Sequence, residues 1–128
     1  MMQAVKVKEI MSRKLVTAAE NESLAAAAQK MLQSKTSSVL VLSNGKPVGI
    51  VTEKDFVKFF AFGVPYDEPL KNHMSRNLVT VDEDTSINDA RNILVTNRIR
   101  HLPVVNKRGE AVGMVTVRDI LETVQTLF

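Results

Sequence analysis

Apolar and polar positions along the first half of the chain follow two different periods. A helical stripe with apolar residues at i, i+3, i+4, i+7 and i+8 is formed by Leu24, Ala27, Ala28, Met31 and Leu32. Such spacing predicts an amphipathic helix. The next apolar run, residues 39–42, is continuous and short, as in a buried strand. Asn44-Gly45 follows it and favours a tight hairpin turn into a returning strand over residues 48–51.

The same order of elements returns in the second half. Residues 87–95 carry a helical stripe, and Ser86 with Asp89 forms a capping-box pattern at its start. Residues 102–105 and 112–115 form two apolar runs on either side of a turn at 106–109. We also expect a short strand at the start of each half, at residues 15–17 and 78–80. A last helix should begin after Thr52 and after Thr116.

The two halves also share sequence motifs. Met11-Ser12-Arg13 and Leu15-Val16-Thr17 recur 63 residues later, as Met74-Ser75-Arg76 and Leu78-Val79-Thr80. The segment Gly49 to Asp55, with the pattern Gly-x-Val-Thr-x-x-Asp, recurs 64 residues later as Gly113 to Asp119. A drift of one residue at a turn is typical of divergent copies of one unit, so the chain is predicted to be a tandem duplication.

This element order predicts an α+β fold built from two β-α-β-β-α repeats. A helix joins the first two strands of each repeat, which suits a parallel pair, and the last two form an antiparallel hairpin. A unit of about 60 residues buries only about 60% of its unfolded surface and is marginal alone, so we expect the repeats to pack with pseudo-two-fold symmetry. Gly63, Pro65 and Pro69 mark a linker at 63–69 between a first repeat at 1–62 and a second at 70–128.

Composition narrows the class of protein. The 128 residues contain no cysteine, which removes disulfides, thiolate nucleophiles and Cys-ligated metal sites. No segment is long and apolar enough for a membrane span, and no secretory signal is visible, so a soluble cytoplasmic protein is expected. With two histidines and no phosphate loop, HExxH or GxSxG motif, we predict no catalysis, no metal site and no required cofactor.

The closing motif carries the main candidate chemistry. Thr52 and Thr116 lie where a strand passes into a helix, whose free N–H groups favour phosphate. Asp55 and Asp119 follow one turn later, where a carboxylate can accept hydrogen bonds from a ribose diol. Lys54 and Arg118 precede the aspartates and could neutralise phosphate. Thr-x-x-Asp is equally a capping box, in which the two side chains serve only the helix start.

On these motifs the chain resembles a tandem pair of CBS domains, also called a Bateman module. The resemblance covers roughly residues 5–127 and includes Arg98 to Val105 in the second copy. It implies a pseudo-symmetric pair with two clefts between the halves, in which many members bind adenine nucleotides or other adenosyl ligands. The candidate ligands are AMP, ADP, ATP and S-adenosylmethionine.

The resemblance also implies weaker contacts to the base or phosphate. These candidates lie at the first strand of each copy or at the start of the second: Val16, Thr17, Val79, Thr80, Ser38, Arg100, His101 and Pro103. Core packing for the valines, local hydrogen bonding for the threonines and a structural role for His101 remain alternatives. The first copy has Ser37-Ser38 where the second has Arg100-His101, so we expect two unequal sites.

The leading hypothesis is therefore a regulatory module that senses an adenosine-containing ligand. Phe56, Phe59, Phe60 and Phe62 exceed one helix face, which suggests a homodimer through the second helix of each repeat, with Ile120, Leu121, Val124, Leu127 and Phe128 as counterparts. The regulated effector is expected to be another polypeptide of unknown identity. Alternatives are an interaction module without a nucleotide and a nucleic-acid-associated protein. The net charge of +3 supports the latter only weakly, because the basic residues are evenly spread.

Overall fold

The computed structural model describes residues 5–127, with side chains through Val124. Its contacts divide the chain into two compact units. The first-repeat unit comprises Val16–Leu78, and the second-repeat unit comprises the residues up to Leu15 together with those from Val79 onward. Each unit holds one three-stranded sheet.

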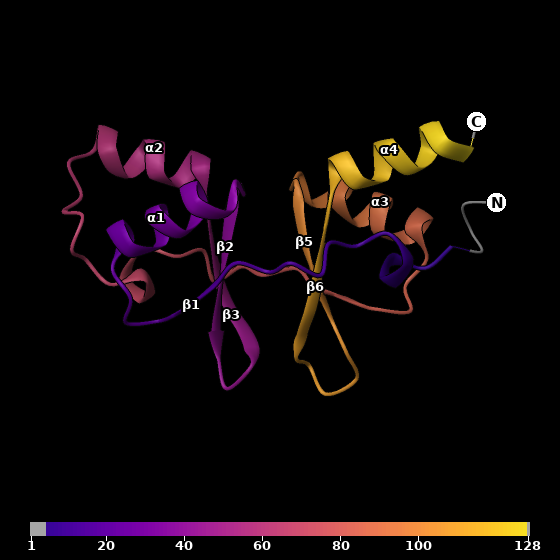
Figure 1. The fold of residues 1–128 in the computed structure, drawn as a ribbon, viewed down its shortest axis with the longest axis horizontal. Coiled ribbons are helices and arrows are strands. Elements are labelled where there is room, and N and C mark those ends of the chain that lie inside the picture. Colours follow the sequence, from indigo (N-terminus) through magenta and orange to yellow (C-terminus); the bar gives the residue numbers. More distant parts are fainter. Residues whose placement is uncertain (1–4, 128) are drawn as a thin grey trace. The chain divides into compact units, whose positions relative to one another are not determined.

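The first-repeat unit has the predicted β-α-β-β-α order. Its elements are β1 (Thr17–Ala19), α1 (Leu24–Ser34), β2 (Ser38–Ser43), β3 (Lys46–Thr52), α2 (Glu53–Ala61) and the 3-10 turn η3 (Leu70–Asn72). β1 pairs with β2 in parallel and β2 pairs with β3 antiparallel, in the order β1-β2-β3. Figure 1 shows α1 and α2 on one side of this sheet.

The second-repeat unit repeats this arrangement. Its elements are η2 (Val7–Glu9), β4 (Val81–Asp82), α3 (Ile87–Asn97), β5 (His101–Val105), β6 (Ala111–Thr116) and α4 (Val117–Leu127). The sheet order is β4-β5-β6, with the same parallel and antiparallel pairings. The predicted α+β class and the two repeats are therefore confirmed.

Local sequence explains where the elements begin and end. Ser23 and Ser86 cap α1 and α3 by accepting backbone N–H bonds at 3.1 Å from Ala26 and Asp89. Asn44 and Gly45 both have positive φ, at 53° and 79°, as the two-residue turn between β2 and β3 requires.

Each unit has its own apolar core. In the first-repeat unit, α1 packs on the sheet through buried Leu24, Ala27 and Met31, which belong to the same core as Val39 and Val41 of β2. The second-repeat unit packs its helical stripe of Ile87, Ala90 and Leu94 in the same way on Leu102 and Val104. Leu40, on the opposite face of β2 from Val39, is also fully buried, as the continuous apolar run predicted.

The short lead-in before each repeat packs in the unit of the other repeat. Val7 belongs to the core of the second-repeat unit, and Leu70 belongs to that of the first, and both are fully buried. The predicted boundaries at 62 and 70 follow the sequence copies, whereas the compact units change over at Val16 and Val79.

The first strand of each repeat begins later than we predicted. β1 begins at Thr17 rather than Leu15, and β4 begins at Val81 rather than Leu78. The register makes Thr17 the partner of Leu40, whose N–H donates to the Val16 carbonyl at 2.9 Å. Pro103 occupies the place of Leu40 in the second repeat and has no N–H to donate, so β4 cannot start there.

Candidate functional site

The predicted site residues of the first repeat meet at one end of its sheet. β1 and β2 run parallel and start at this end with Thr17 and Ser38, while the antiparallel β3 finishes here with Thr52. Ser38 pairs directly with Thr52 and is buried, with 8% of its surface exposed. Asp55 follows on the first turn of α2. Residues spread over the sequence are therefore brought together.

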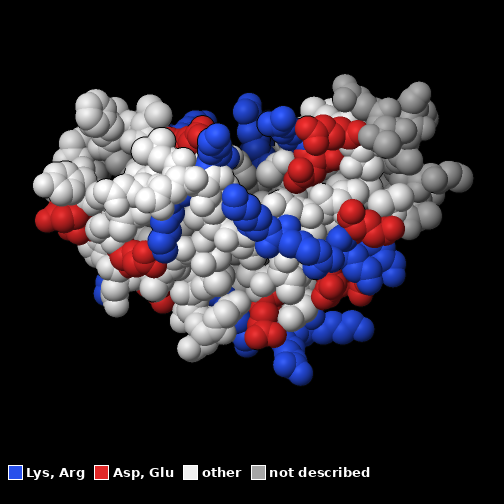
Figure 2. All heavy atoms as spheres, viewed as in Figure 1, with Lys and Arg blue, Asp and Glu red and all other residues white. Residues whose placement is uncertain are grey.

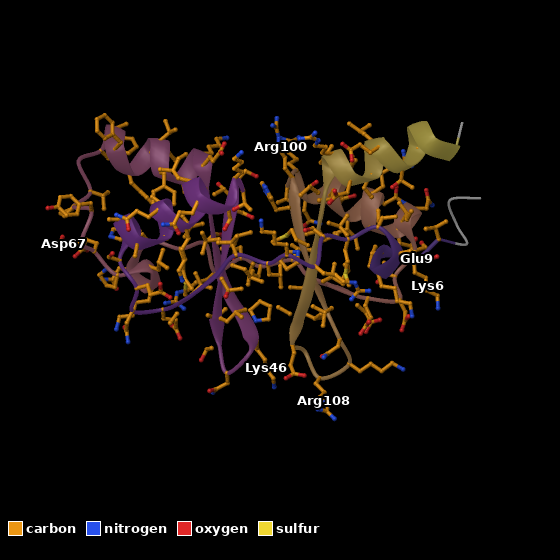
Figure 3. All side chains as sticks on the ribbon, viewed as in Figure 1. Lys6, Glu9, Lys46, Asp67, Arg100 and Arg108 are labelled. Carbon is orange, nitrogen blue, oxygen red and sulfur yellow. The ribbon has the colours of Figure 1, made fainter. Side chains whose placement is uncertain are left out.

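The second repeat gathers the equivalent residues. His101 at the start of β5 pairs with Thr116 at the end of β6, and Asp119 follows on α4. Arg100 directly precedes β5, at the end of that strand opposite the hairpin tip that carries Arg108 (Figure 3). The hairpin tips thus lie away from the candidate site within each unit.

The closing motifs form capping boxes in both repeats. The Thr52 N–H donates to Asp55 Oδ2 at 2.8 Å, and the Thr52 hydroxyl donates to the same oxygen at 3.1 Å. The Thr116 N–H donates to Asp119 Oδ2 at 2.8 Å, and the Asp119 N–H donates to the Thr116 hydroxyl at 3.2 Å. The capping interpretation therefore describes what these side chains do in the free protein.

Capping occupies only one oxygen of each carboxylate. Within residues 5–124, Oδ1 of Asp55 and of Asp119 accepts no hydrogen bond, and both side chains are half-buried. A carboxylate oxygen retains acceptor capacity for a hydroxyl. The same aspartate can therefore cap its helix and bind a diol at once.

Backbone bonds fix the turn between strand and helix. The Glu53 N–H donates to the Ser37 carbonyl at 3.0 Å, and the Val117 N–H donates to the Arg100 carbonyl at 3.2 Å. These bonds and the capping boxes occupy several of the helix-start N–H groups that we predicted to be free to bind a phosphate. The strand ends are consequently tied to the helix starts, with less free donor capacity than an open helix terminus.

The two cations of the motif differ in their surroundings. Lys54 is exposed on the first turn of α2. Arg118 is exposed on α4, and its Nε donates to Glu122 Oε1 at 3.0 Å. An ion pair this exposed contributes little stability, so Arg118 can exchange Glu122 for another anion at small cost.

The candidate valines just before β1 and β4 contribute partly to the apolar cores. Val16 packs against the core of the first-repeat unit and Val79 against that of the second. Thr17 is half-buried within β1, whereas Thr80 is exposed and precedes β4. Pro103 is fully buried in β5. The two threonines are therefore not equivalent in the structure, although they match in sequence.

Sequence reasoning missed an ion pair beside Thr17. Lys30 of α1 donates from Nζ to the Thr17 carbonyl at 2.8 Å and lies 2.8 Å from Glu22 Oε1. Glu22 Oε2 accepts the Ala19 N–H at 2.7 Å. The hydrogen bond from Lys30 is the main reason that the pKa of Glu22 is lowered, and the Ala19 N–H adds to it. The sequence offers one signal for this ion pair: Glu22 and Lys30 carry opposite charges and lie eight residues apart, one before the predicted helix and one within it.

The glycines of the closing motif accommodate methionines. A Cβ on Gly49 would overlap the Met74 side chain, and one on Gly113 would overlap the Met11 side chain. The following lead-in residues form backbone bridges beside them, Ser75 with Ile50 and Ser12 with Met114. The close approach at Gly49 is thus made by a lead-in segment of the protein itself.

A depression of about 560 Å³ lies on the helical side of the first-repeat unit. Its lining is mainly apolar and combines Ala28, Met31, Leu32 and Phe56 with Lys35, Thr36 and Glu53. It shares none of the predicted site residues. In the part of the chain that the structure describes, no group of three His, Asp or Glu side chains could hold a metal ion. No helix there is long and apolar enough to cross a membrane.

Comparisons with known proteins agree with this geometry. A sequence profile of the CBS domain matches residues 7–61 and again residues 70–126. An uncharacterized 17.7 kDa protein of Acidianus ambivalens is 36% identical over 118 residues, which cover 91% of this chain and 71% of that protein. Protein MK0525 of Methanopyrus kandleri is 36% identical over 124 residues, and the match spans only 63% of that protein's length.

A solved structure of a CBS domain pair is also similar to this chain. The CBS domain pair of protein MJ0100 was crystallised in complex with 5′-methylthioadenosine and S-adenosyl-L-methionine. It has a TM-score of 0.89 and 28% identity, and the match covers 98% of this chain and 99% of that one.

Proposed function

Because the chain belongs to the CBS domain family and carries two CBS domains, we propose that it is a regulatory module that binds an adenosine-containing ligand without catalysis. The binding elements in this proposal are the strand ends marked by Thr52 and Asp55 and by Thr116 and Asp119. The sensed ligand biases a partner protein, so the output of the module is a change in interaction rather than a reaction.

One observation carries the proposal. Asp55 and Asp119 each cap a helix through Oδ2 while Oδ1 accepts no hydrogen bond within residues 5–124. A half-buried carboxylate held by capping bonds, with one unused oxygen, suits the hydroxyls of a ribose, and charge-assisted bonds of this kind are among the stronger hydrogen bonds. The two adenosyl ligands bound to the MJ0100 domain pair support the same ligand class for this chain.

The candidate ligands differ at the group attached to the ribose. AMP, ADP and ATP carry phosphate, which Lys54, Arg100 or Arg118 could neutralise, whereas S-adenosylmethionine carries a sulfonium cation. Arg100 is exposed and Ser37 stands at the equivalent position of the first repeat. A phosphate-bearing ligand should therefore favour the second repeat.

Isothermal titration calorimetry tests the proposal. The purified chain is titrated with AMP, ADP, ATP, S-adenosylmethionine and 5′-methylthioadenosine, with guanosine monophosphate as the control for base identity. We expect heat and a rise in Tm with at least one adenosine compound and none with the guanosine compound. No binding of any adenosine compound at millimolar concentration would contradict the proposal.

The partner in this proposal includes a second copy of the chain. Each unit exposes apolar side chains at equivalent helical positions, Leu32 and Val57 in the first repeat and Val95 and Leu121 in the second. A symmetric homodimer buries the same patch on both subunits, and the last helix of each repeat provides such a patch. Leu127 and Phe128, which the sequence added to this surface, lie outside the residues whose side chains are described.

The first repeat exposes additional aromatic side chains. Phe56 and Phe59 pack inward, edge to face, with ring centroids 5.4 Å apart. Phe60 is 90% exposed and Phe62 is 82% exposed. Figure 2 shows few charged side chains over this end of α2, except acidic ones at its margin. We propose that the effector, whose identity is open, is another polypeptide.

A further inference from the structure

The backbone carbonyls at the start of β1 have hydrogen-bond partners, whereas among residues 5–124 those just before β4 have none. In the first repeat the Leu40 N–H donates to the Val16 carbonyl at 2.9 Å. The alternation of a parallel ladder then turns the Thr17 carbonyl away from β2, where Lys30 Nζ binds it at 2.8 Å. Both carbonyls at this strand end therefore already have a partner.

Within residues 5–124, the equivalent backbone carbonyls of the second repeat have no such partner. Pro103 replaces Leu40 and removes the N–H that would bind the Val79 carbonyl. Ile93 stands where the first repeat has Lys30, and Thr85 stands where it has Glu22. Across residues 5–124, the backbone groups of Val79 and Thr80 have no hydrogen-bond partner.

Free backbone groups at this place match the edge of an adenine base. Adenine presents an amino donor beside ring-nitrogen acceptors. Backbone N–H and C=O groups commonly fix the orientation of a small ligand in its site. A carbonyl oxygen has two lone pairs, and a partner already bound at one of them leaves less acceptor capacity for the amino group, which lowers the affinity of that repeat.

We infer that Lys30 is a specificity-determining residue that closes the first repeat to the base, so that an adenosine ligand binds first at Val79 and Thr80 of the second repeat. The inference rests on the proposed function and adds which repeat is occupied. Glu22 holds the Lys30 ammonium in place, since its Oε1 lies 2.8 Å from Nζ and its Oε2 is bound to the Ala19 N–H. One ligand per chain is therefore the expected stoichiometry at concentrations that saturate the second repeat.

Amide NMR spectra of the wild-type chain test this assignment. The probes are 5′-methylthioadenosine, which has no phosphate, and AMP. We expect the Thr80 amide resonance to move and saturate with either ligand, while the Thr17 amide stays unchanged until about tenfold higher ligand concentration, the factor that one hydrogen bond supplies. A Thr17 shift at the same midpoint as that of Thr80, or at a lower one, overturns the inference.

Variants of Lys30 test its role separately. Lys30→Met keeps a long, unbranched side chain and removes the ammonium group. Lys30→Arg is the matched control, because its guanidinium can still bind the Thr17 carbonyl. Lys30→Met should bring the two midpoints together and raise the stoichiometry from one ligand per chain toward two. Lys30→Arg should behave as wild type, and unchanged binding by Lys30→Met would show that Lys30 does not close the first repeat.

The outcomes separate this inference from the proposed function. Binding of both ligands with equal response in the two repeats contradicts the inference and leaves the proposed function standing. No response of either amide, with no heat from any adenosine compound, contradicts both. The wild-type spectra are decisive even where a variant is unstable.

Discussion

Met74 lies directly against Gly49 in the middle of β3, at the place where any other residue would carry a Cβ. Met11 has the same relationship to Gly113 in β6. Each methionine opens one sequence copy, and each glycine belongs to the closing motif of the other copy. The two motifs that define the repeat are therefore structural partners across the duplication.

Gly49→Ala should destabilise the chain by about 1–3 kcal/mol, because the added methyl group overpacks a buried contact. In a Met74→Ala background the same substitution should cost less, since the overlapping side chain is gone. Urea unfolding of the two single variants and the double variant gives the coupling energy. Strictly additive effects would contradict the contact.

Because the lead-in before each repeat packs in the unit of the other repeat, the compact units predict which fragments fold. A fragment of residues 16–78 keeps buried Leu70 and Met74 with the first sheet. It also keeps the carbonyls of Glu68 and Tyr66 that accept the Leu24 and Ala25 N–H groups at 2.9 Å. This fragment should unfold cooperatively in urea by circular dichroism, whereas residues 1–62 should not. The opposite result would place the domain boundary at the linker.

The pKa of Glu22 predicts an acid-sensitive contribution to stability. A carboxyl whose pKa is lowered in the folded state stabilises the fold above its unfolded pKa, about 4.3, and loses that contribution as the pH falls through the folded pKa. Glu22→Gln should therefore cost about 1 kcal/mol at pH 7 and progressively less below about pH 4. The check is urea unfolding of both proteins from pH 3 to pH 7, and a pH-independent difference would contradict it.

The exposed helical positions predict a dimer that one charge can disrupt. Val57→Glu, or Leu121→Glu in the second repeat, should shift the chain from dimer to monomer in analytical ultracentrifugation, because the charge would lose its solvation in an apolar interface. Lys46→Glu at a hairpin tip (Figure 3) is the control and should not alter the sedimentation coefficient. A monomeric wild-type chain would contradict the proposed homodimer.

Much of the fold could be predicted because the duplicated pattern reports local structure twice. The amphipathic helices, the Asn44-Gly45 turn and the Thr-x-x-Asp caps depend on neighbours a few residues away, and the structure contains them, although Leu32 and Val95 of the predicted stripes are exposed. The first strands were placed too early, since their pairing depends on an N–H at Leu40 and its absence at Pro103. The exchanged lead-ins could not be predicted, because Val7 and Leu70 have the same apolar character whichever sheet they pack on.

The sequence predicted which residues of the candidate site lie together, but it did not predict all the hydrogen bonds that they make. Ser38, Thr52 and Asp55 meet as the resemblance implied, because the strand order brings their ends together. The sequence could not indicate that capping uses one carboxylate oxygen and leaves the other, nor that Lys30 binds the Thr17 carbonyl. Both depend on side-chain directions fixed by tertiary packing. Ligand contact by these residues stays a prediction.

Titration of the Asp119→Asn and Asp55→Asn variants with the best adenosine ligand tests the central claim most directly. Asparagine can still accept the capping N–H but has no charged oxygen for a ribose, so we expect Asp119→Asn to bind at least about tenfold more weakly. Ser86→Ala, which removes a helix cap outside the site, should bind as wild type. Unchanged affinity in both aspartate variants would contradict the account.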